Sequence, residues 1–531
     1  MATTPTSERR RWWAVFGLVA AAGLAWALAT PLFTGPDEVS QARRAAAVAR
    51  GQFTGRQDQP DPALLLTVEV PGLYGQPAEE QWLCHLGPLV TGAPQEAMAL
   101  PTPPCPDLRA APPGIVTAET VQYRGQPFFY ALVGAPTLVD RGLTGAYAMR
   151  AVGVLLTAAL VASAAATLAG TGRPALAGLG LLGCLTPGVV YLAGSTNPSA
   201  VEIAAALSAW AAVAAVAGTD PSRATGAGGA PVPAPGPVDL DRLVRRLGPA
   251  LVVLTLCRGL GPAFAAAVVV VGALAAGWTR SRALLRRSDL RWWAGAVVAA
   301  TVASGAWLAH IGRTFPLPDR PGSGWADAFG WLPWYLRQSV GVFGTNDSAV
   351  SPAATALWCL VVLAVTAVGV TTHLQARRPR TASLAVATLV GGLALNITAE
   401  GLSLPPIGFF WQGRYALPLL VGGVVLATVT VPDAGLDAQP GSPRWRMARG
   451  PWVPAAAVLI VVHAQGFTTV ARHHGSPTGA AAWAWVATYA ALITALAVTL
   501  GRRPPSRPAR PPTSPGHTSP PVGDPPSSDD R

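Results

Sequence analysis

Apolar runs long enough to cross a membrane recur along the whole chain. The first covers residues 12–33, and ten more follow it. A helix of roughly 20 apolar residues spans the hydrocarbon core of a bilayer. We therefore predict an all-α polytopic membrane protein. The ten later runs cover residues 146–169, 175–195, 199–218, 260–277, 292–310, 351–372, 382–400, 412–431, 452–470 and 480–500.

The composition agrees with this class of protein. Only 12% of the residues are charged and 51% are hydrophobic, whereas soluble domains have about 25% charged residues. The formal net charge of +12 is concentrated in clusters between the apolar runs, as topology signals are. The sequence lacks the aromatic and basic surface pattern of nucleic-acid-binding proteins, so we expect no nucleic-acid partner.

The start of the chain has features of a signal peptide. Arg9, Arg10 and Arg11 stand directly before the first apolar run. A cleavable signal peptide has a shorter apolar core, of about 7–15 residues, and a small-residue cleavage site. Residues 12–33 are longer and lead into PLFTGPDE. We therefore expect a first transmembrane helix that is retained.

One apolar piece, residues 248–257, is too short to cross the bilayer as a helix. Because Cys257-Arg258-Gly259 joins it to the run 260–277, we expect a hairpin that enters the membrane, breaks near Arg258 and returns. With this hairpin, all basic clusters lie on one side, which the positive-inside rule identifies as cytoplasmic. The prediction is about 12 membrane segments with both termini in the cytoplasm. The basic clusters lie at 9–11, 173, 242–246, 280–291, 377–380, 444–449 and 502–503.

Two outer loops are long enough to contain structure of their own. Residues 34–145 are rich in Pro and Gly and include the strand-like fragment LLLTVEV at 64–70. Residues 311–350 include the aromatic stretch WADAFGWLPWYL at 325–336. The Trp and Tyr residues of that stretch suit a helix in the membrane interface.

The segments on the cytoplasmic side are expected to lack a fold of their own. The linker at 219–247 and the tail at 502–531 cannot bury enough apolar surface to fold alone. The predicted organisation is a cytoplasmic N-terminal tail (1–11), a first helix (12–33), a large extracytoplasmic loop (34–145), a multi-span domain (146–501) and a disordered cytoplasmic tail (502–531).

The five cysteines follow this map. Cys84 and Cys105 lie in the large outer loop, where an oxidising environment permits a disulfide between them. Cys184, Cys257 and Cys359 lie in apolar runs, so we expect them to be inert buried residues.

Adjacent carboxylates stand where the first apolar run ends. Asp37 and Glu38 follow Pro36, and VSQARRAAAVARGQ after them has helical character. Acidic residues are common at helix starts, where the helix dipole stabilises them. The alternative is that they face a substrate that needs a base.

A second polar group begins the run 199–218. Asn197-Pro198 is a turn signal, Ser199 is suited to cap the next helix, and Glu202 stands where a capping box places an acid. Capping and a role of Asn197 and Glu202 in an outer site both remain open.

Further polar residues lie close to predicted membrane boundaries. Arg258 is suited either to reach the interface or to hold a phosphate. Glu400 and the stretch around Gln412, Arg414 and Tyr415 are candidates for binding a substrate, and the alternative is an interfacial anchor.

The sequence gives no sign of a cofactor. Metal-ligand spacing is absent, and the paired histidines His473-His474 lie on a short outer loop. No phosphate-binding loop is evident either. We expect no metal site among these motifs, and the sequence leaves a requirement for a divalent ion open.

Five motifs occur in an order that resembles a known family. Together they resemble the DUF2142 family of predicted bacterial membrane proteins, which groups with the GT-C glycosyltransferases. Related sequences commonly have His where Ser40 stands here. The motifs are GPDEVSQARRAAAVARGQ, GQPFFYALVGAP, AGSTNPSAVEIAAALSAW, CRGLGP and WQGRYALPLLVG.

The resemblance implies a GT-C-like fold with a large outer loop after the first helix. It also implies an inverting transfer of a sugar from a polyprenyl-phosphate donor to an envelope glycan or protein acceptor, on the outer face of the cell membrane. Asp37 would then be the catalytic base, with Glu38 assisting or positioning it. Arg258 or Arg414 would hold the lipid phosphate.

Two other classes of function fit the same topology. A transporter or flippase for a lipid-linked or polar solute would also use a broken hairpin and an arginine at membrane depth, although no internal repeat of the kind common in transporters is evident. A non-catalytic membrane protein of envelope assembly is the third class. Convergence of Asp37, Arg258 and Arg414 would favour the enzyme, because a base must reach the proton it abstracts.

Overall fold

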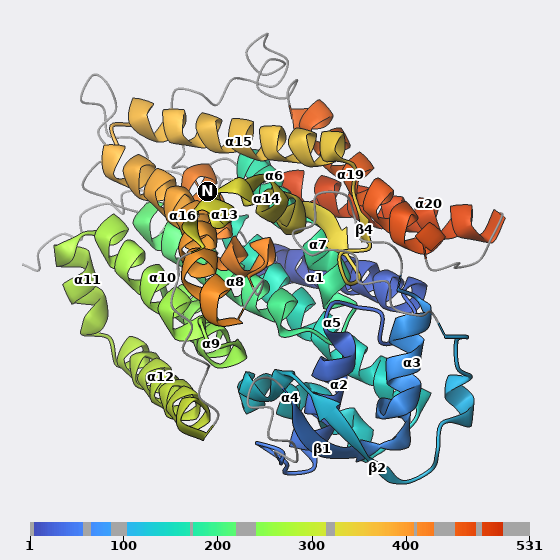
Figure 1. Cartoon of the computed structure of the whole chain (residues 1–531). Coiled ribbons are helices and arrows are strands. Elements are labelled where there is room, and N and C mark those ends of the chain that lie inside the picture. Colours follow the sequence, from blue (N-terminus) through green and yellow to red (C-terminus); the bar gives the residue numbers. More distant parts are fainter. Residues whose placement is uncertain are drawn as a thin grey trace, which may run out of the picture.

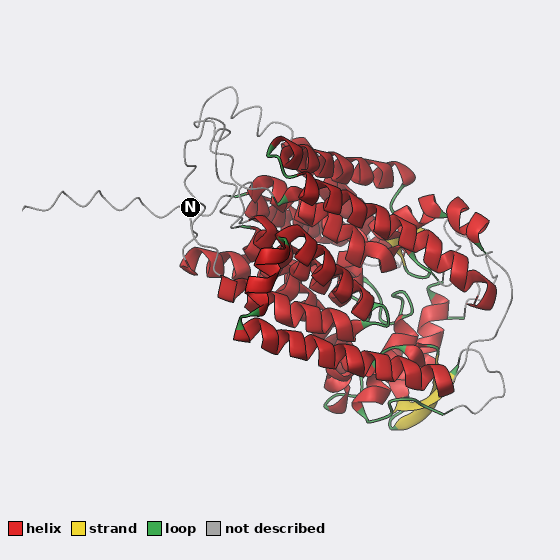
Figure 2. Cartoon of the chain, turned by 90° about the vertical axis from the view of Figure 1, so that its left-hand side faces the viewer, coloured by secondary structure: helices red, strands yellow, loops and turns green. Residues whose placement is uncertain are grey.

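The structure is a computed structural model of the 531-residue chain. It describes residues 5–56, 65–86, 103–169, 174–218, 240–314, 324–407, 411–429, 452–473 and 480–502. Helices make up most of this part, and strands form two two-stranded sheets (Figure 2). The tail from residue 503 and residues 219–239 of the predicted linker lie outside the described residues.

Within the described residues, eight helices are long and apolar enough to cross a membrane, or up to ten when each of two bent pairs counts as one span. The predicted class of all-helical polytopic membrane protein is confirmed (Figure 1). The total of about 12 segments stays a prediction. The eight helices are α1 (Pro5–Ala29), α5 (Leu143–Leu168), α8 (Pro198–Gly218), α12 (Ser288–Thr314), α15 (Pro352–Gln375), α16 (Pro379–Ile407), α19 (Trp452–His473) and α20 (Ala480–Gly501).

Four other helices form two bent pairs. Helix α6 (Pro174–Cys184) bends by 64° into α7 (Pro187–Ala193), and α10 (Gly261–Ala276) bends by 119° into α11 (Trp278–Leu285). The shorter helix α17 (Leu417–Thr428) follows a 3-10 turn, η6 (Gly413–Ala416).

The predicted hairpin exists, but its first leg is longer than expected. Helix α9 (Leu240–Cys257) has 18 residues, so it begins eight positions before the apolar piece 248–257. Residues 240–247 form its first two turns. The sequence predicts them in the cytoplasmic linker, because they include several arginines. These arginines are tolerated because Glu8 of α1 accepts hydrogen bonds from Arg242 and Arg246. A helix of this length rises about 27 Å, which is close to the thickness of a bilayer core.

Small residues let the central helices approach closely. The core of α8 contains Trp210, which is fully buried and donates a hydrogen bond from Nε1 to the Pro418 carbonyl of α17 at 2.9 Å. A Cβ atom at Gly422 would lie 2.3 Å from the Trp210 ring, so only glycine fits there. Packing of this kind joins α8 to α17 although their sequences lie far apart.

The large loop folds into a small unit beside the helices (Figure 1). We name it the loop unit. It consists of α2 (Glu38–Ala49), β1 (Leu66–Pro71), α3 (Gln76–Cys84), β2 (Ile115–Thr120), α4 (Pro127–Gly134) and four 3-10 turns, η1 (Gly72–Tyr74), η2 (Leu108–Ala110), η3 (Gln122–Arg124) and η4 (Ala135–Leu138). β1 and β2 pair antiparallel, with Val68 opposite Ala118, so residues 66–70 of the strand-like fragment do form a strand.

A disulfide and the hydrogen bonds of one arginine hold the loop unit together. Cys84 and Cys105 form a disulfide, with Cα atoms 5.1 Å apart. The Arg43 guanidinium of α2 donates hydrogen bonds to the carbonyls of Tyr74, Gly75 and Glu119. One buried arginine therefore connects α2 to the turn η1 and to β2.

The aromatic stretch 325–336 is only partly exposed. Helix α13 (Trp325–Gly330) exposes Phe329, but Trp334 and Tyr335 of α14 (Leu332–Gly341) are buried against η6. The prediction of one interfacial helix was wrong for this second half, because its rings pack inside the protein. A two-residue hairpin pair, β3 (Val342–Phe343) and β4 (Ser348–Ala349), follows α14.

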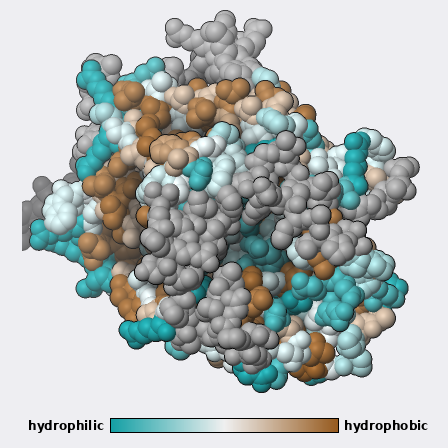
Figure 3. Space-filling model, in the orientation of Figure 1, coloured by the Kyte–Doolittle hydropathy of each residue, from teal (hydrophilic) through white to brown (hydrophobic). Residues whose placement is uncertain are grey.

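The two ends of the helical bundle differ. At one end Glu8 contacts the start of α9, and Arg11 donates to the carbonyls of Leu500 and Arg502. We name this the Glu8 end and the opposite end, where the loop unit lies, the site end. In the view of Figure 3, hydrophobic residues gather along the upper and left parts of the surface, whereas the surface of the loop unit at the lower right is mostly hydrophilic.

Candidate functional site

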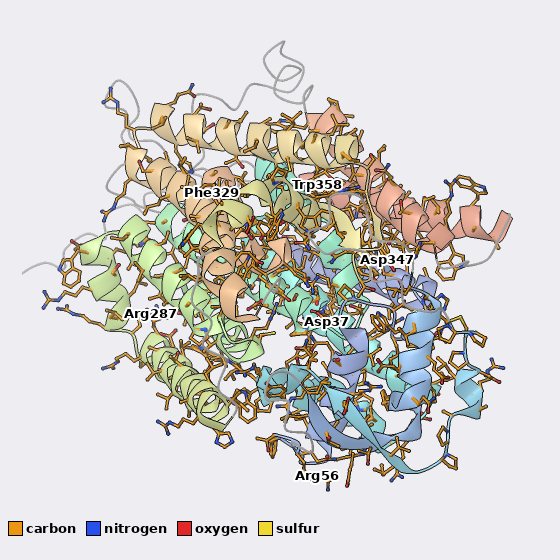
Figure 4. The ribbon with its side chains drawn as sticks, viewed as in Figure 1. Asp37, Arg56, Arg287, Phe329, Asp347 and Trp358 are labelled. Atoms are coloured by element: carbon orange, nitrogen blue, oxygen red, sulfur yellow. A yellow bond between two sulfur atoms is a disulfide. The ribbon has the colours of Figure 1, made fainter. Side chains whose placement is uncertain are left out.

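Three residues predicted from separate motifs meet at the site end. The Arg414 Nη2 atom lies 3.4 Å from Asp37 Oδ2. The guanidinium carbons of Arg258 and Arg414 lie 4.0 Å and 5.3 Å from the centre of the Tyr415 ring. Asp37 lies near the middle of Figure 4, between the loop unit and the helices above it. Asp37, Arg258 and Arg414 therefore lie close together.

The backbone holds Asp37 in an unusual conformation. Its φ is 59°, in the left-handed region that Asp and Asn tolerate better than most residues. Asp37 occupies the N-cap of α2, yet its side chain makes no capping hydrogen bond. The carboxylate is instead directed to Arg414 and stays about one-third exposed, at 35%. Capping, the structural explanation that the sequence left open, does not account for this carboxylate.

Glu38 differs sharply from its neighbour. It is 2% exposed, and Arg150 binds both of its carboxylate oxygens at 2.7 Å. The backbone N–H groups of Gly35 and Thr196 donate to it as well, at 3.0 Å and 2.9 Å. Because protein donors occupy both oxygens, Glu38 positions the turn before α2 and does not face a substrate.

Arg150 is a site residue that the sequence analysis missed. It lies in α5, is fully buried, and uses five hydrogen bonds of its guanidinium. Two go to Glu38, and three go to the carbonyls of Ala27, Thr30 and Pro31 at the end of α1. It therefore satisfies the last carbonyls of α1 and fixes the turn that presents Asp37.

The start of α8 contacts the same turn. The Asn197 side chain accepts from the Ser199 N–H and donates to the Pro36 carbonyl, both at 3.0 Å. Asn197, rather than the predicted Ser199, therefore caps α8, because Pro198 occupies the first helical position and leaves the Asn carboxamide within reach. A Cβ atom at Gly35 would lie 2.9 Å from Ser195, so glycine permits this close contact.

Arg258 lies at the break between α9 and α10. Its Nη1 atom donates to Ser199 Oγ at 2.9 Å and lies 3.8 Å from Glu202 Oε2. Glu202 is 2% exposed, and its Oε1 atom has no hydrogen-bond partner. Glu202 therefore does not complete a capping box. It balances the charge of Arg258, whose side chain is one-quarter exposed.

The turn η6 presents Arg414 and Tyr415. Glu400 accepts from the Trp411 N–H, and Gln338 accepts from the Gly413 N–H, both at 2.8 Å. A Cβ atom at Gly413 would lie 1.9 Å from the Tyr335 carbonyl oxygen, so this position requires glycine. Glu400 thus holds the turn.

Two buried polar atoms remain unsatisfied beside this turn. Arg414 Nε and Gln412 Oε1 have no hydrogen-bond partner among the described residues. Such atoms are uncommon in folded proteins, and a bound group is one way to satisfy them.

Helix α4 supports the site from the loop unit. Tyr130 donates a hydrogen bond to Gln41, one turn after Asp37 on α2, and Gln126 donates to the Arg258 carbonyl at 3.1 Å. Arg44 lies 5.8 Å from the Tyr130 ring centre. Burial lowers the pKa of the Arg44 guanidinium to about 10, although Tyr130 acts in the opposite direction. Burial likewise raises the pKa of Tyr130. These residues pack and orient the site and are not exposed to a ligand.

Metal ligands do not gather among the described residues of this site. One group of potential ligands is present in the described part of the chain, formed by Cys84, His85 and Cys105 on the loop unit. Two of these are joined in the disulfide. His473, at the end of α19, lies 3.4 Å from Asp347, and His474 lies outside the described residues.

A family model identifies the chain. The model described as predicted membrane protein (DUF2142) matches residues 21–422. The chain belongs to this family. In this DUF2142 protein, the matched region contains all five motifs, from GPDEVSQARRAAAVARGQ to WQGRYALPLLVG. The contacts above show that these motifs, which are separated in sequence, lie together at the site end.

No curated protein matches the chain. The solved structures that resemble it include two of ArnT from Cupriavidus metallidurans, one in the apo state and one bound to undecaprenyl phosphate. Their sequence identities to this DUF2142 protein are 15% and 16%, with TM-scores of 0.39 and 0.41. The matches cover 91% of this chain and 75% and 76% of the ArnT chains. Likeness at this level carries no argument about function.

Proposed function

We propose that this DUF2142 protein is a GT-C-type inverting glycosyltransferase. In this proposal it moves a sugar from a polyprenyl-phosphate donor to an envelope glycan or protein acceptor, on the outer face of the cell membrane. The observation that supports it is the meeting of one partly exposed carboxylate, Asp37, with two arginines, Arg258 and Arg414.

Each residue type suits one part of this reaction. A hydroxyl acceptor is a weak nucleophile, and Asp37 takes its proton as the acceptor oxygen attacks the anomeric carbon. The bond from that carbon to the phosphate oxygen breaks at the same time, and its electron pair stays on the phosphate. Arg258 and Arg414 stabilise the negative charge that the leaving phosphate gains.

The remaining predicted residues divide into two groups. Gln412 and Tyr415 lie beside the arginines, and Gln412 Oε1 is available to a substrate hydroxyl. Glu202 keeps Arg258 in place through its charge. Asn197 and Glu400 act indirectly, since they hold the turns that present Asp37 and Arg414.

The proposal includes the membrane topology. It has about 12 segments, with both termini in the cytoplasm and the site end outside, as the positive-inside rule gives. The described structure supports this in one respect, because Arg11 near the N-terminus contacts the carbonyls of Leu500 and Arg502 near the C-terminus.

Loss of the gene followed by glycan analysis of the cell envelope tests the proposal. A missing or truncated glycan is expected, restored by the wild-type gene but not by Asp37→Asn. Glu69→Gln is the matched control, because Glu69 is an exposed carboxylate of the loop unit that lies outside the site. An unchanged envelope, or full restoration by membrane-inserted Asp37→Asn, would reject the assignment.

A further inference from the structure

Helix α4 and the turn η4 expose an apolar surface that the protein does not cover. Leu132 is 61% exposed, Leu138 54% and Val139 93%. We name these three side chains the α4 face. The loop unit, by contrast, buries most of its other large apolar side chains in its own core. Leu138 and Val139 are adjacent in the chain, six and seven residues after Leu132, and exposed apolar groups that gather on a surface mark a contact with something apolar.

The opposite side of α4 faces the candidate site. Gln126, directly before α4, is fully buried and donates to the Arg258 carbonyl and to Ser304 Oγ of α12. Tyr130 is bonded to Gln41. One short helix therefore has the site on one side and the α4 face on the other.

Two helices indicate how deep in the membrane the contacts of Gln126 with Ser304 and Arg258 lie. In α12, the pair Trp292-Trp293 stands beside Arg291, which is the composition of a membrane interface. Arg287, directly before α12, is paired with Asp241 at the start of α9, which places this interface at the Glu8 end. From Trp292 to Ser304 the helix advances 304 − 292 = 12 residues, or about 18 Å.

Helix α9 gives the same result independently. Arg246, which is bonded to Glu8, and Arg258 are also 258 − 246 = 12 residues apart, or about 18 Å. A bilayer core is about 30 Å thick. Gln126 therefore contacts Ser304 and Arg258 at a level inside the hydrocarbon core, and a tilt of either helix would place the contact deeper.

We propose that α4 and η4 lie within the leaflet at the site end, with the α4 face against lipid acyl chains. This partner is a lipid bilayer, because the α4 face is continuous along the chain with α5, a membrane span that begins at Leu143 and exposes Tyr147 and Leu155. The polar pair Asp140-Arg141 follows Val139 directly and is suited to the headgroup layer.

In this arrangement, the candidate site lies below the surface of the membrane. Residues 34–145, expected from the sequence to lie wholly outside, then have one edge in the bilayer. A group that binds Arg258 would then approach it from within the leaflet. The inference does not depend on the reaction proposed above, since a flippase or an assembly protein would have the same contact.

Spin labels test the contact directly. Leu132→Cys and Val139→Cys are each labelled with a nitroxide in the full chain, carrying Cys359→Ala and placed in nanodiscs of phosphatidylglycerol and phosphatidylethanolamine. Ile115→Cys is the control, because Ile115 is an exposed apolar residue of the same unit, 46% exposed, on β2. The ratio of oxygen to nickel-chelate accessibility is expected to be several-fold higher at 132 and 139 than at 115.

Two results would overturn the proposal. Equal ratios at all three positions would mean that the α4 face is in water, and shielding of positions 132 and 139 from both reagents would mean that a protein covers it.

Maleimide labelling of the same cysteines in intact membranes is a second measurement that needs no purified protein. Position 115 is expected to react and position 132 to be protected, and equal reaction would contradict the contact.

Discussion

At the residue scale, the adjacent acids Asp37 and Glu38 have opposite roles. Asp37 is one-third exposed and faces Arg414, whereas Glu38 is buried and bound to Arg150 on both oxygens. Of these two neighbouring carboxylates, Glu38 supports the turn, and Asp37 is the one that the proposed reaction uses. The sequence shows the pair, but only the structure shows which acid is available.

This difference predicts opposite outcomes for two substitutions. Glu38→Gln leaves the Arg150 charge buried without its partner, which is expected to lower the free energy of unfolding by about 3–5 kcal/mol. Asp37→Asn is expected to keep wild-type stability, because Asn also tolerates the left-handed conformation. Thermal unfolding of the two variants in nanodiscs measures this, and equal losses of stability would contradict the assignment.

Single residues were predictable where they broke a pattern. Asp37, Arg258 and Arg414 stand at breaks between apolar runs, and charged residues at such places invite attention. Arg150 was not found, because it stands five positions into the run 146–169, where an arginine resembles one that reaches for the interface. Its partners Glu38 and the end of α1 become visible only when α1 and α5 are packed together.

At the scale of elements, the turn η6 depends on one glycine. Gly413→Ala would place a Cβ atom 1.9 Å from the Tyr335 carbonyl oxygen. The resulting shift of η6 is expected to lower stability by about 1–3 kcal/mol and to move Arg414 away from Asp37. Gly391→Ala in α16 is the control, because nothing lies within 4 Å of the added atom. Equal unfolding temperatures for the two variants would refute the tight contact.

The disulfide of the loop unit gives a second prediction for an element. Replacing Cys84 and Cys105 with Ser opens a loop with a sequence separation of 21. Stability of the loop unit is expected to fall by about 3 kcal/mol, since the bond limits the freedom of the unfolded chain. Limited proteolysis with mass spectrometry measures this. Free thiols in the exported wild-type protein would contradict the bond.

Elements were predictable where hydropathy alone defines them. The spans 146–169 and 452–470 correspond to α5 and α19 within a few residues at each end. The length of helix α9 was underestimated, because the apolar run begins only after the arginines of residues 242–246, whereas the helix begins before them. The aromatic stretch of α14 was misplaced, because hydropathy does not distinguish a ring in the interface from one buried against η6.

At the scale of the whole molecule, the two ends of the bundle are chemically distinct. The site end has the loop unit and the converging residues, and the Glu8 end joins the start of α1 and α9 to the end of α20. The basic clusters predict two different ends, but no pattern in the sequence predicts the packing that brings five separate motifs together. That packing depends on contacts between helices distant in the sequence.

The topology predicts which side each end faces. Green fluorescent protein fused after Gly501 is expected to fluoresce, because the proposed topology has this end in the cytoplasm. Alkaline phosphatase fused after Thr120, within the loop unit, is expected to be active outside. The reverse pattern would place the site end in the cytoplasm and exclude a donor that acts on the outer face.

The proposed function requires Asp37 to act as a base beside two phosphate-binding arginines. Transfer of labelled sugar from a polyprenyl-phosphate donor, in vesicles that contain the full chain, measures it most directly. The rate is expected to fall by about 10²–10⁴-fold in Asp37→Asn and to stay at the wild-type level in the exposed-carboxylate control Glu69→Gln. An Asp37→Asn protein that inserts normally and retains the wild-type rate would contradict the account.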